Sequence, residues 1–386
     1  MRMKRFCGFI TGFVFFLSGM VKLMDPVGAG LVMDEYFSFL HISFLSFSAK
    51  AFGVFFALTE TVIGAALITG VWRKVTAVCA IVLQAFFTLL TLLLVIFNPE
   101  MDCGCFGEAI HLTHLQTFIK NIILLALLLA YYIPHDQLGE TLKKKYVSFG
   151  LVTVSVIAFT IYSLIYIPLI DFTAYRPGAE LEAGAQVNAD DMYESIFTYE
   201  KDGIQETFTL GHLPDSTWTF VSVDTRLKKG YEESLTGLSF YAPQTGEYQD
   251  KLAIEGKVMV ISVYNPDMKK DKWTQIEAFA TRASKAGFRV LLLCASQERI
   301  PASLQEQAYI SDYKTLISLN RSNGGITYFY NGQLIRKWAS INTPDASQLQ
   351  AIAETGPTEI SIEQDNKGSL VFQGFLLYVF AIMLLL

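Results

Sequence analysis

The chain has 386 residues, of which 52% are hydrophobic and 17% charged, and its formal net charge at pH 7 is −6. Its hydrophobic residues are gathered in separate blocks, a pattern typical of integral membrane proteins that excludes an ordinary soluble or disordered chain. The acidic balance argues against nucleic acid as a partner.

Six apolar runs are long enough to cross a hydrocarbon core, which needs about 20 residues. They cover residues 6–24, 49–71, 75–97, 115–133, 147–170 and 369–386. The first run follows Arg2, Lys4 and Arg5, as in a signal peptide, but no A-x-A cleavage pattern comes after it. We therefore predict a retained helix and a four-helix transmembrane bundle over residues 1–135, with lipid as its surroundings.

The basic residues predict the orientation of these helices, because lysine and arginine accumulate in cytoplasmic loops. With the N-terminus inside, the outer connections of the membrane part contain only Lys22, Lys50 and Lys120. The inner segments contain Arg2, Lys4, Arg5, Arg73, Lys74, Lys143, Lys144 and Lys145. We predict a bacterial inner-membrane protein in which 136–170 is a cytoplasmic loop and fifth helix, and 369–386 is a C-terminal anchor. The loop 25–48, the Cys-Gly-Cys segment at 103–105 and residues 171–368 then lie in the oxidising periplasm, where a disulfide can persist.

Residues 171–368 are predicted to form a separate soluble domain. They contain 27 acidic and 19 basic residues, a net charge of −8, whereas the remainder of the chain has a net charge of +2. Roughly 200 residues are enough to bury a core. Short strands are expected at 197–199, 206–210 and 217–223, between turn-forming residues.

The second half of this domain alternates strand, helix, strand, helix, hairpin and helix. The expected elements are strands at 257–264 and 290–294, a helix at 271–286, a helical segment from Pro301, a hairpin at Asn331-Gly332 and a last helix opening at Thr343-Pro344. This order resembles that of thioredoxins over about 255–356, which implies an α/β thioredoxin-like fold.

The resemblance departs from thioredoxins at the redox motif. Residues 265–271 (Asn-Pro-Asp-Met-Lys-Lys-Asp) occupy the place of the Cys-x-x-Cys and contain no cysteine. Arg321-Ser-Asn-Gly-Gly325 stands where a proline usually precedes the hairpin. We therefore expect no dithiol chemistry in this domain, and we expect Cys294, in an apolar strand, to be an inert core residue.

The membrane part contains a second pattern, Asp102-Cys-Gly-Cys-Phe-Gly107, in the gap before the fourth helix. Together with Gly19-Met-Val-Lys-Leu-Met-Asp-Pro26 and Glu60, it resembles the DoxX and MauE group of four-helix membrane proteins over about 1–135. In that group, MauE is associated with the maturation of methylamine dehydrogenase, a disulfide-rich periplasmic enzyme, and usually acts beside a separate thioredoxin-like protein. A methylamine-specific role does not follow for this chain, because nothing in these residues recognises an amine substrate. Here the thioredoxin-like part is fused to the same chain.

Cys103 and Cys105 have three competing interpretations. In the first, they form a small, strained disulfide that exchanges readily, and electrons pass to a lipid-soluble quinone, as in the similar vitamin K epoxide reductase group. That group has a second cysteine pair, which the 25–48 loop lacks, so a partner protein must supply the shuttle. In the second, His111 and His114 complete a zinc or copper site with both cysteines. In the third, the pair is only a structural disulfide or turn.

Glu60 lies in the middle of the second apolar run, where an ionisable group is costly and is by default a functional candidate. It either transfers protons or makes a structural hydrogen bond, for example to Lys22. We expect Lys22 itself to extend to the outer interface. Cys7 and Cys79 are expected to be packing residues.

The favoured function is assistance to thiol-disulfide exchange, or maturation of exported proteins, by a thiol-disulfide oxidoreductase that uses Cys103, Cys105 and Glu60. Its partner is a periplasmic client or redox protein. One alternative is a non-catalytic scaffold whose outer domain binds a partner. Another is a metal-binding or transport protein; the scarcity of polar residues in the apolar runs disfavours a transporter.

Overall fold

A computed structural model describes residues 2–99, 101–133, 141–181, 193–201, 204–209, 214, 217–227 and 237–385. The predicted boundary at residue 135 and most of the loop that follows it lie outside these residues. All contacts, cavities and helices given below lie in the described part of the chain.

The described residues include six helices that are long and apolar enough to cross a membrane, so the chain is a multi-pass membrane protein. They are α1 (Arg2–Met24), α3 (Ala49–Thr69), α4 (Arg73–Phe97), α5 (His114–Tyr132), α6 (Lys143–Ile165) and α13 (Pro357–Leu385). The six predicted apolar runs are confirmed as helices. The last of them begins well before the predicted residue 369.

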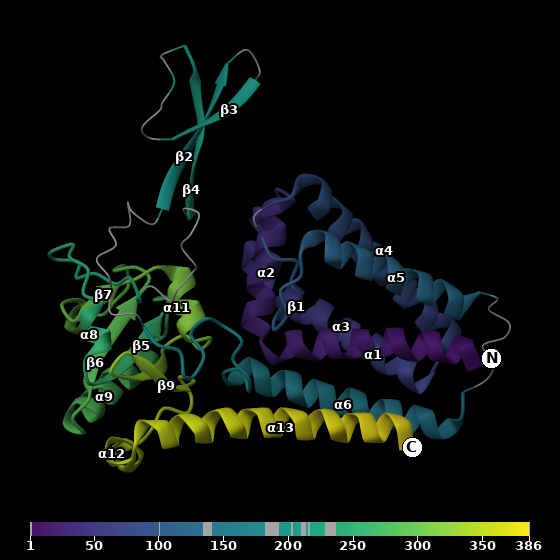
Figure 1. The fold of residues 1–386 in the computed structure, drawn as a ribbon. Helices are drawn as coiled ribbons and strands as arrows, with labels where there is room; N and C mark the ends of the chain where they lie inside the picture. The colour runs from purple at the N-terminus through teal and green to yellow at the C-terminus, as the bar shows by residue number, and fades with distance from the viewer. Residues whose placement is uncertain are drawn as a thin grey trace.

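Four of these helices, α1, α3, α4 and α5, form a bundle, and α6 and α13 pack against each other on its α1 and α3 side (Figure 1). Helices α1 and α3 approach closely, since a Cβ at Gly64 would meet the backbone of Phe16. Small residues permit such contacts between membrane helices, whose association depends on van der Waals packing. Both chain termini lie at the end of the bundle away from the C-terminal domain (Figure 1).

The prediction of a loop at 25–48 is wrong, because this segment is mostly helical. It contains α2 (Pro26–Phe39) and the 3-10 helix η1 (Ser43–Ser48). Asp25 caps α2 by accepting a hydrogen bond from the Gly28 amide, and Pro26 occupies the first helical position, which suits proline. Helix α2 is too short to span a membrane, so a search for long apolar runs misses it. It lies across the bundle end that faces the C-terminal domain (Figure 1).

The C-terminal domain contains a mixed five-stranded sheet in the order β7-β6-β5-β8-β9. Its strands are β5 (Lys257–Val263), β6 (Arg289–Cys294), β7 (Ala308–Ile310), β8 (Gly325–Tyr330) and β9 (Gln333–Trp338). Strands β5, β6 and β7 pair in parallel, whereas β8 is antiparallel to both β5 and β9. The predicted hairpin at Asn331-Gly332 is confirmed.

The helices of this domain are α8 (Lys251–Ile254), α9 (Lys270–Lys285), α10 (Ala302–Gln305), α11 (Tyr313–Leu319) and α12 (Ala346–Glu354). The predicted alternation is confirmed, with β7 and α11 as additions. The predicted start of the last helix is wrong: Asp345, and not Thr343, caps α12, because its carboxylate and the Gln348 side chain form a capping box.

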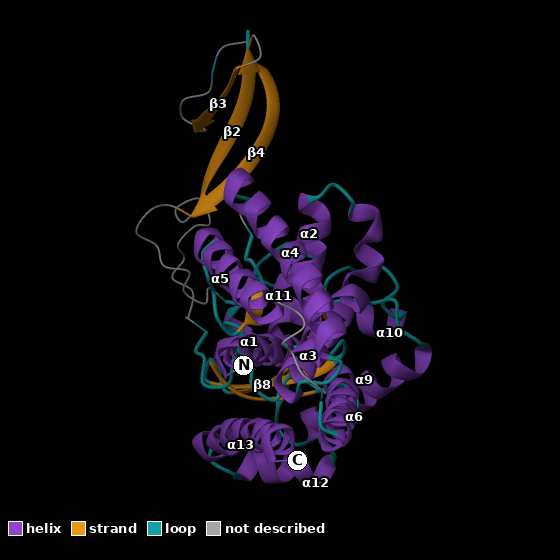
Figure 2. Ribbon diagram, turned by 90° about the vertical axis from the view of Figure 1, so that its right-hand side faces the viewer, coloured by secondary structure: helices purple, strands orange, loops and turns teal. Residues whose placement is uncertain are grey.

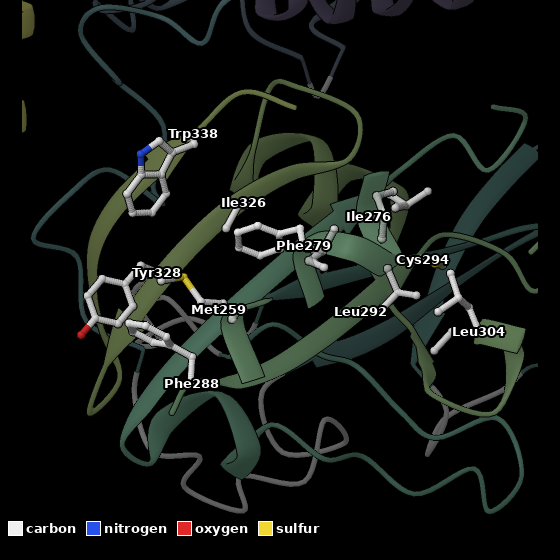
Figure 3. Packing of buried hydrophobic residues seen from close by; sticks show 14 of the residues in the cluster. Met259, Ile276, Phe279, Phe288, Leu292, Cys294, Leu304, Ile326, Tyr328 and Trp338 are labelled. Carbon is white, nitrogen blue, oxygen red and sulfur yellow. The ribbon is translucent and has the colours of Figure 1, made fainter. Parts of the chain in front are cut away.

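Alternate residues of β5 point into two cores on opposite faces of the sheet, as a strand buried on both faces requires. Met259 and Ile261 join one core, which contains Phe279, Tyr328 and Trp338 (Figure 3). Val258 and Val260 join the other. The sheet is therefore a rigid support for the loops at its edges.

A second, three-stranded antiparallel sheet in the order β3-β2-β4 stands apart from the rest of the molecule (Figures 1 and 2). It consists of β2 (Tyr193–Lys201), β3 (Ile204–Thr209) and β4 (Thr219–Leu227). The three strands predicted in this region are confirmed and are longer than expected.

Candidate functional site

The Cys-Gly-Cys segment is pressed against α2. Cys105 begins a short strand, β1 (Cys105–Glu108), and Gly104 has a positive φ of 59°. A Cβ at Gly104 would overlap the side chain of Val32 in α2. Both the backbone conformation and the close approach therefore require glycine between the two cysteines.

Hydrogen bonds from two different helices hold the backbone of the cysteine pair. The Tyr36 hydroxyl of α2 donates to the Cys103 carbonyl at 3.0 Å. The Ser18 hydroxyl of α1 donates to the Cys105 carbonyl at 2.6 Å. Burial raises the pKa of Tyr36 well above its ordinary value, so the phenol stays protonated and remains a donor.

The two thiols are free and differ in exposure: Cys103 is buried, with 5% of its surface exposed, and Cys105 is partly exposed. Burial raises the pKa of the Cys103 thiol, because a buried thiolate is poorly solvated, and the Thr117 hydroxyl opposes the rise. The buried Thr117 oxygen has no hydrogen-bond partner among the described residues. Cys105 is thus the more accessible residue of the pair.

A cavity of about 380 Å³ lies within the bundle, and both cysteines line it. Its lining is mainly apolar and includes aromatic side chains from α1 to α4, namely Phe15, Tyr36, Phe37, Phe52, Phe56, Phe86 and Phe87. Glu60 also lines it. The structure therefore brings all three predicted catalytic residues, Cys103, Cys105 and Glu60, to one cavity.

Glu60 is paired with Lys22 inside this cavity. The Lys22 Nζ lies 2.6 Å from a Glu60 carboxylate oxygen, and the two side chains are only 16% and 7% exposed. Lys22 therefore points into the bundle, and the prediction that it extends to the outer interface is wrong. The attraction of Glu60 at short range outweighs the hydration of the ammonium group at the membrane surface.

Other polar groups of the cavity were not predicted as site residues. Gln84 donates to the Asn121 carbonyl at 3.1 Å, and the Asn121 amide donates to the Thr91 hydroxyl at 3.2 Å. Lys120 lies 4.9 Å from the centre of the Phe106 ring and also lines the cavity. Asn121 and Lys120 could have been identified from the sequence, because both are polar residues within an apolar run.

The cysteine segment also borders a second, much smaller pocket. Its lining contains Asp102, His111 and Leu112 together with both cysteines. Cys103 and Cys105 therefore form part of the wall between this pocket and the large cavity.

The two histidines of the metal interpretation have hydrogen-bond partners other than the cysteines, although His111 lines the smaller pocket with them. His111 hydrogen-bonds to Asp102, and His114 contacts the Met101 carbonyl at 2.9 Å. Within the described ranges, no group of three or more histidine, cysteine or acidic side chains is arranged to hold a metal ion.

The remaining cysteines lie away from the cavity lining. Cys7 is buried, as predicted, whereas Cys79 is exposed on α4, so the prediction that it is a packing residue is wrong. Cys294 is buried at the end of β6, where burial raises its pKa to about 12. Cys294 is a core residue, as predicted (Figure 3).

Comparison with known families finds a match in the membrane part of the chain. The family model described as Methylamine utilisation protein MauE matches residues 2–134, which include the cavity and the cysteine pair. A second model, described as Domain of unknown function (DUF8463), matches residues 193–230. No family match confirms the thioredoxin-like resemblance of residues 255–356, and no curated protein or solved structure matches the chain.

Proposed function

We propose, from a membrane domain that matches the MauE family model, that this chain is a bacterial inner-membrane thiol-disulfide oxidoreductase acting on exported proteins. Cys103 and Cys105 are its exchanging pair. The observation that carries the proposal is the position of this pair between a small pocket on one side and an aromatic cavity, with a buried ion pair, on the other. A cysteine pair in such a wall can exchange with a protein thiol on the side of the small pocket. It can pass electrons to a lipophilic acceptor on the side of the large cavity.

The exchange balances as two thiol-disulfide steps. A thiolate of the client attacks Cys105 in the Cys103–Cys105 disulfide, which forms a mixed disulfide and releases Cys103 as a thiolate. A second thiolate of the client then attacks the client sulfur of that mixed disulfide and releases Cys105. The client gains a disulfide, and the pair is left as a dithiol that must lose two electrons and two protons.

The large cavity supports a lipid-soluble quinone as the acceptor. A flat, apolar ring fits a lining rich in phenylalanine, and ligand sites of this kind combine an apolar wall with a few polar groups. A quinone would supply the two-electron, two-proton acceptor that the dithiol needs. The residues of the chain would orient such a ring, exclude water and hold protons at the Glu60 carboxylate and the Lys22 ammonium.

The C-terminal domain would dock the client. Its strand order, with parallel β5 and β6 followed by the antiparallel hairpin of β8 and β9, supports a thioredoxin-like fold. The uneven distribution of lysine and arginine between the two sides of the membrane part supports a periplasmic position for this domain and for the cysteine segment. Because the domain has no dithiol of its own, its contribution is recognition.

A non-catalytic scaffold is the competing function, and the burial of Cys103 favours it. Thiol trapping in intact cells separates the two. In the Cys103→Ser variant, the Cys105 thiolate can still attack a disulfide of an exported protein and release one client sulfur as a thiolate, but no Cys103 thiol remains to resolve the mixed disulfide, so these adducts should accumulate; Cys105→Ser should abolish them. Cys79→Ser is the matched control. Absence of any such adduct, with unchanged client oxidation in both variants, would contradict the oxidoreductase function and favour the non-catalytic scaffold.

A further inference from the structure

Arg321 joins the C-terminal domain to the membrane domain through two carboxylates. It lies between α11 and β8, and its side chain is only 4% exposed. The guanidinium Nε lies 2.9 Å from Asp25 Oδ2, and Nη2 lies 3.1 Å from Glu108 Oε1. A third guanidinium nitrogen, Nη1, donates to the Ile317 carbonyl at 3.3 Å, which fixes the side chain on its own domain.

Both carboxylates belong to elements that contain or contact the cysteine pair. Glu108 is the last residue of β1, and Cys105 is the first. Asp25 caps α2, and Tyr36 near the other end of that helix donates to the Cys103 carbonyl. One guanidinium therefore holds the strand that contains Cys105 and the helix that holds the backbone of Cys103.

A second ion pair lies beside the first. Lys337 of β9 lies 2.6 Å from Asp171, with side-chain exposures of 4% and 12%. Arg321, Lys337 and Asp171 line one small cavity at the junction between the domains. Because buried charges are strongly destabilising when a partner is removed, this junction favours one arrangement of the two domains.

We propose that Arg321 is a positioning residue through which the C-terminal domain holds the Cys-Gly-Cys segment closed over the cavity. The inference deepens the proposed function and rests on it for its catalytic meaning, since a held segment keeps Cys103 buried and presents Cys105. The C-terminal domain then does more than dock clients: it sets which of the two sulfurs is accessible.

The test is the labelling of Cys103 by a charged maleimide in the full-length reduced protein, embedded in lipid nanodiscs. Cys103 is 5% exposed, so its labelling requires local opening of the segment, and the rate reports that opening. Peptide mass spectrometry identifies the labelled cysteine without removing the others. We expect Arg321→Met to speed Cys103 labelling by about tenfold or more, because charge-assisted hydrogen bonds are lost.

Glu108→Gln gives a second variant, in the membrane domain, that tests the contact even if Arg321→Met fails to fold. It should also speed Cys103 labelling, and the double variant should label no faster than the faster single variant, because both changes open the same contact. Arg299→Met is the matched control, since Arg299 forms an exposed ion pair with Asp267 within the C-terminal domain. It should leave the rate unchanged.

Two results separate this inference from the proposed function. Unchanged Cys103 labelling in both Arg321→Met and Glu108→Gln would overturn the positioning role, whatever the exchange activity. Faster labelling in these variants, in a protein whose cysteines form no mixed disulfide with exported proteins, would support the positioning role and remove the oxidoreductase function.

Discussion

Lys22 of α1 and Glu60 of α3 form a 2.6 Å ion pair in the wall of the cavity that Cys103 and Cys105 also line. The pair joins two helices of the bundle in a buried position, where each charge alone would be unstable. It links the stability of the membrane domain to the candidate site.

Breaking this pair should destabilise the protein strongly. Glu60→Gln or Lys22→Met leaves one partner unneutralised and should cost about 3–5 kcal/mol, whereas the double variant Lys22→Met/Glu60→Gln should cost clearly less than the sum. Thermal unfolding in nanodiscs measures the effect. Lys314→Met, which removes an exposed and longer contact to Glu35, is the control and should change little. Additive single effects would show that the two residues act independently.

Gly104→Ala should disrupt the cysteine segment. The positive φ of 59° and the overlap with Val32 should together cost about 1–3 kcal/mol and should increase Cys103 labelling. Gly150→Ala in α6 is the matched control, because no atom lies near a Cβ at that position. Normal stability and labelling in Gly104→Ala would contradict the close contact with α2.

Thr117→Val should raise the pKa of Cys103 further. Burial already raises this pKa, and the Thr117 hydroxyl opposes the rise, so its removal should shift the midpoint of the labelling rate to higher pH. Thr117→Ser keeps the hydroxyl and should label like the original protein. An unshifted midpoint in Thr117→Val would show that the hydroxyl does not act on the sulfur.

The same shift predicts how stability depends on pH. Because the folded state favours the neutral Cys103 thiol, its contribution is fully present below the ordinary cysteine pKa of about 8.5 and is lost as pH rises through the raised folded value. Cys103→Ala, compared with the original protein by thermal unfolding between about pH 7 and 10, should lack this component. An identical decline in both proteins would exclude it.

Filling the cavity should separate the two halves of the proposed reaction. Leu90→Trp places a large ring in the cavity and should slow quinone-dependent reoxidation of the dithiol by about tenfold or more, while a single turnover with a client dithiol stays near normal. Its neighbour Leu89 is exposed on the outer face of α4, so Leu89→Trp is the control. Equal reoxidation rates in the two variants would remove the cavity as the acceptor site.

The sequence predicted the membrane helices because long apolar runs are a local signal, and the structure confirms all six as helices. It also predicted Cys103, Cys105 and Glu60 as a functional set, since thiols in a polar gap and a carboxylate within an apolar run are unusual. That these residues share one cavity could not be predicted. Their meeting depends on the packing of α1, α2, α3 and α5.

The missed features depend on tertiary contacts or on short elements. Helix α2 has 14 residues, too few to cross a membrane, so it gives no long apolar run in the sequence. Its start is nevertheless indicated by Asp25-Pro26, which is a helix-start signal. The inward direction of Lys22 follows from Glu60, which is 38 residues away. Arg321 contacts Glu108 across 213 residues, and nothing local to either residue indicates that contact.

The most direct test of the proposed oxidoreductase function is the redox state of Cys103 and Cys105 in native membranes, measured by acid quenching and mass-labelling of free thiols. We predict that the pair is largely a disulfide when oxidised quinone is present, becomes a dithiol on addition of a reduced client in quinone-depleted membranes, and returns to the disulfide when quinone is restored. A pair that keeps one redox state through all three conditions would contradict this function.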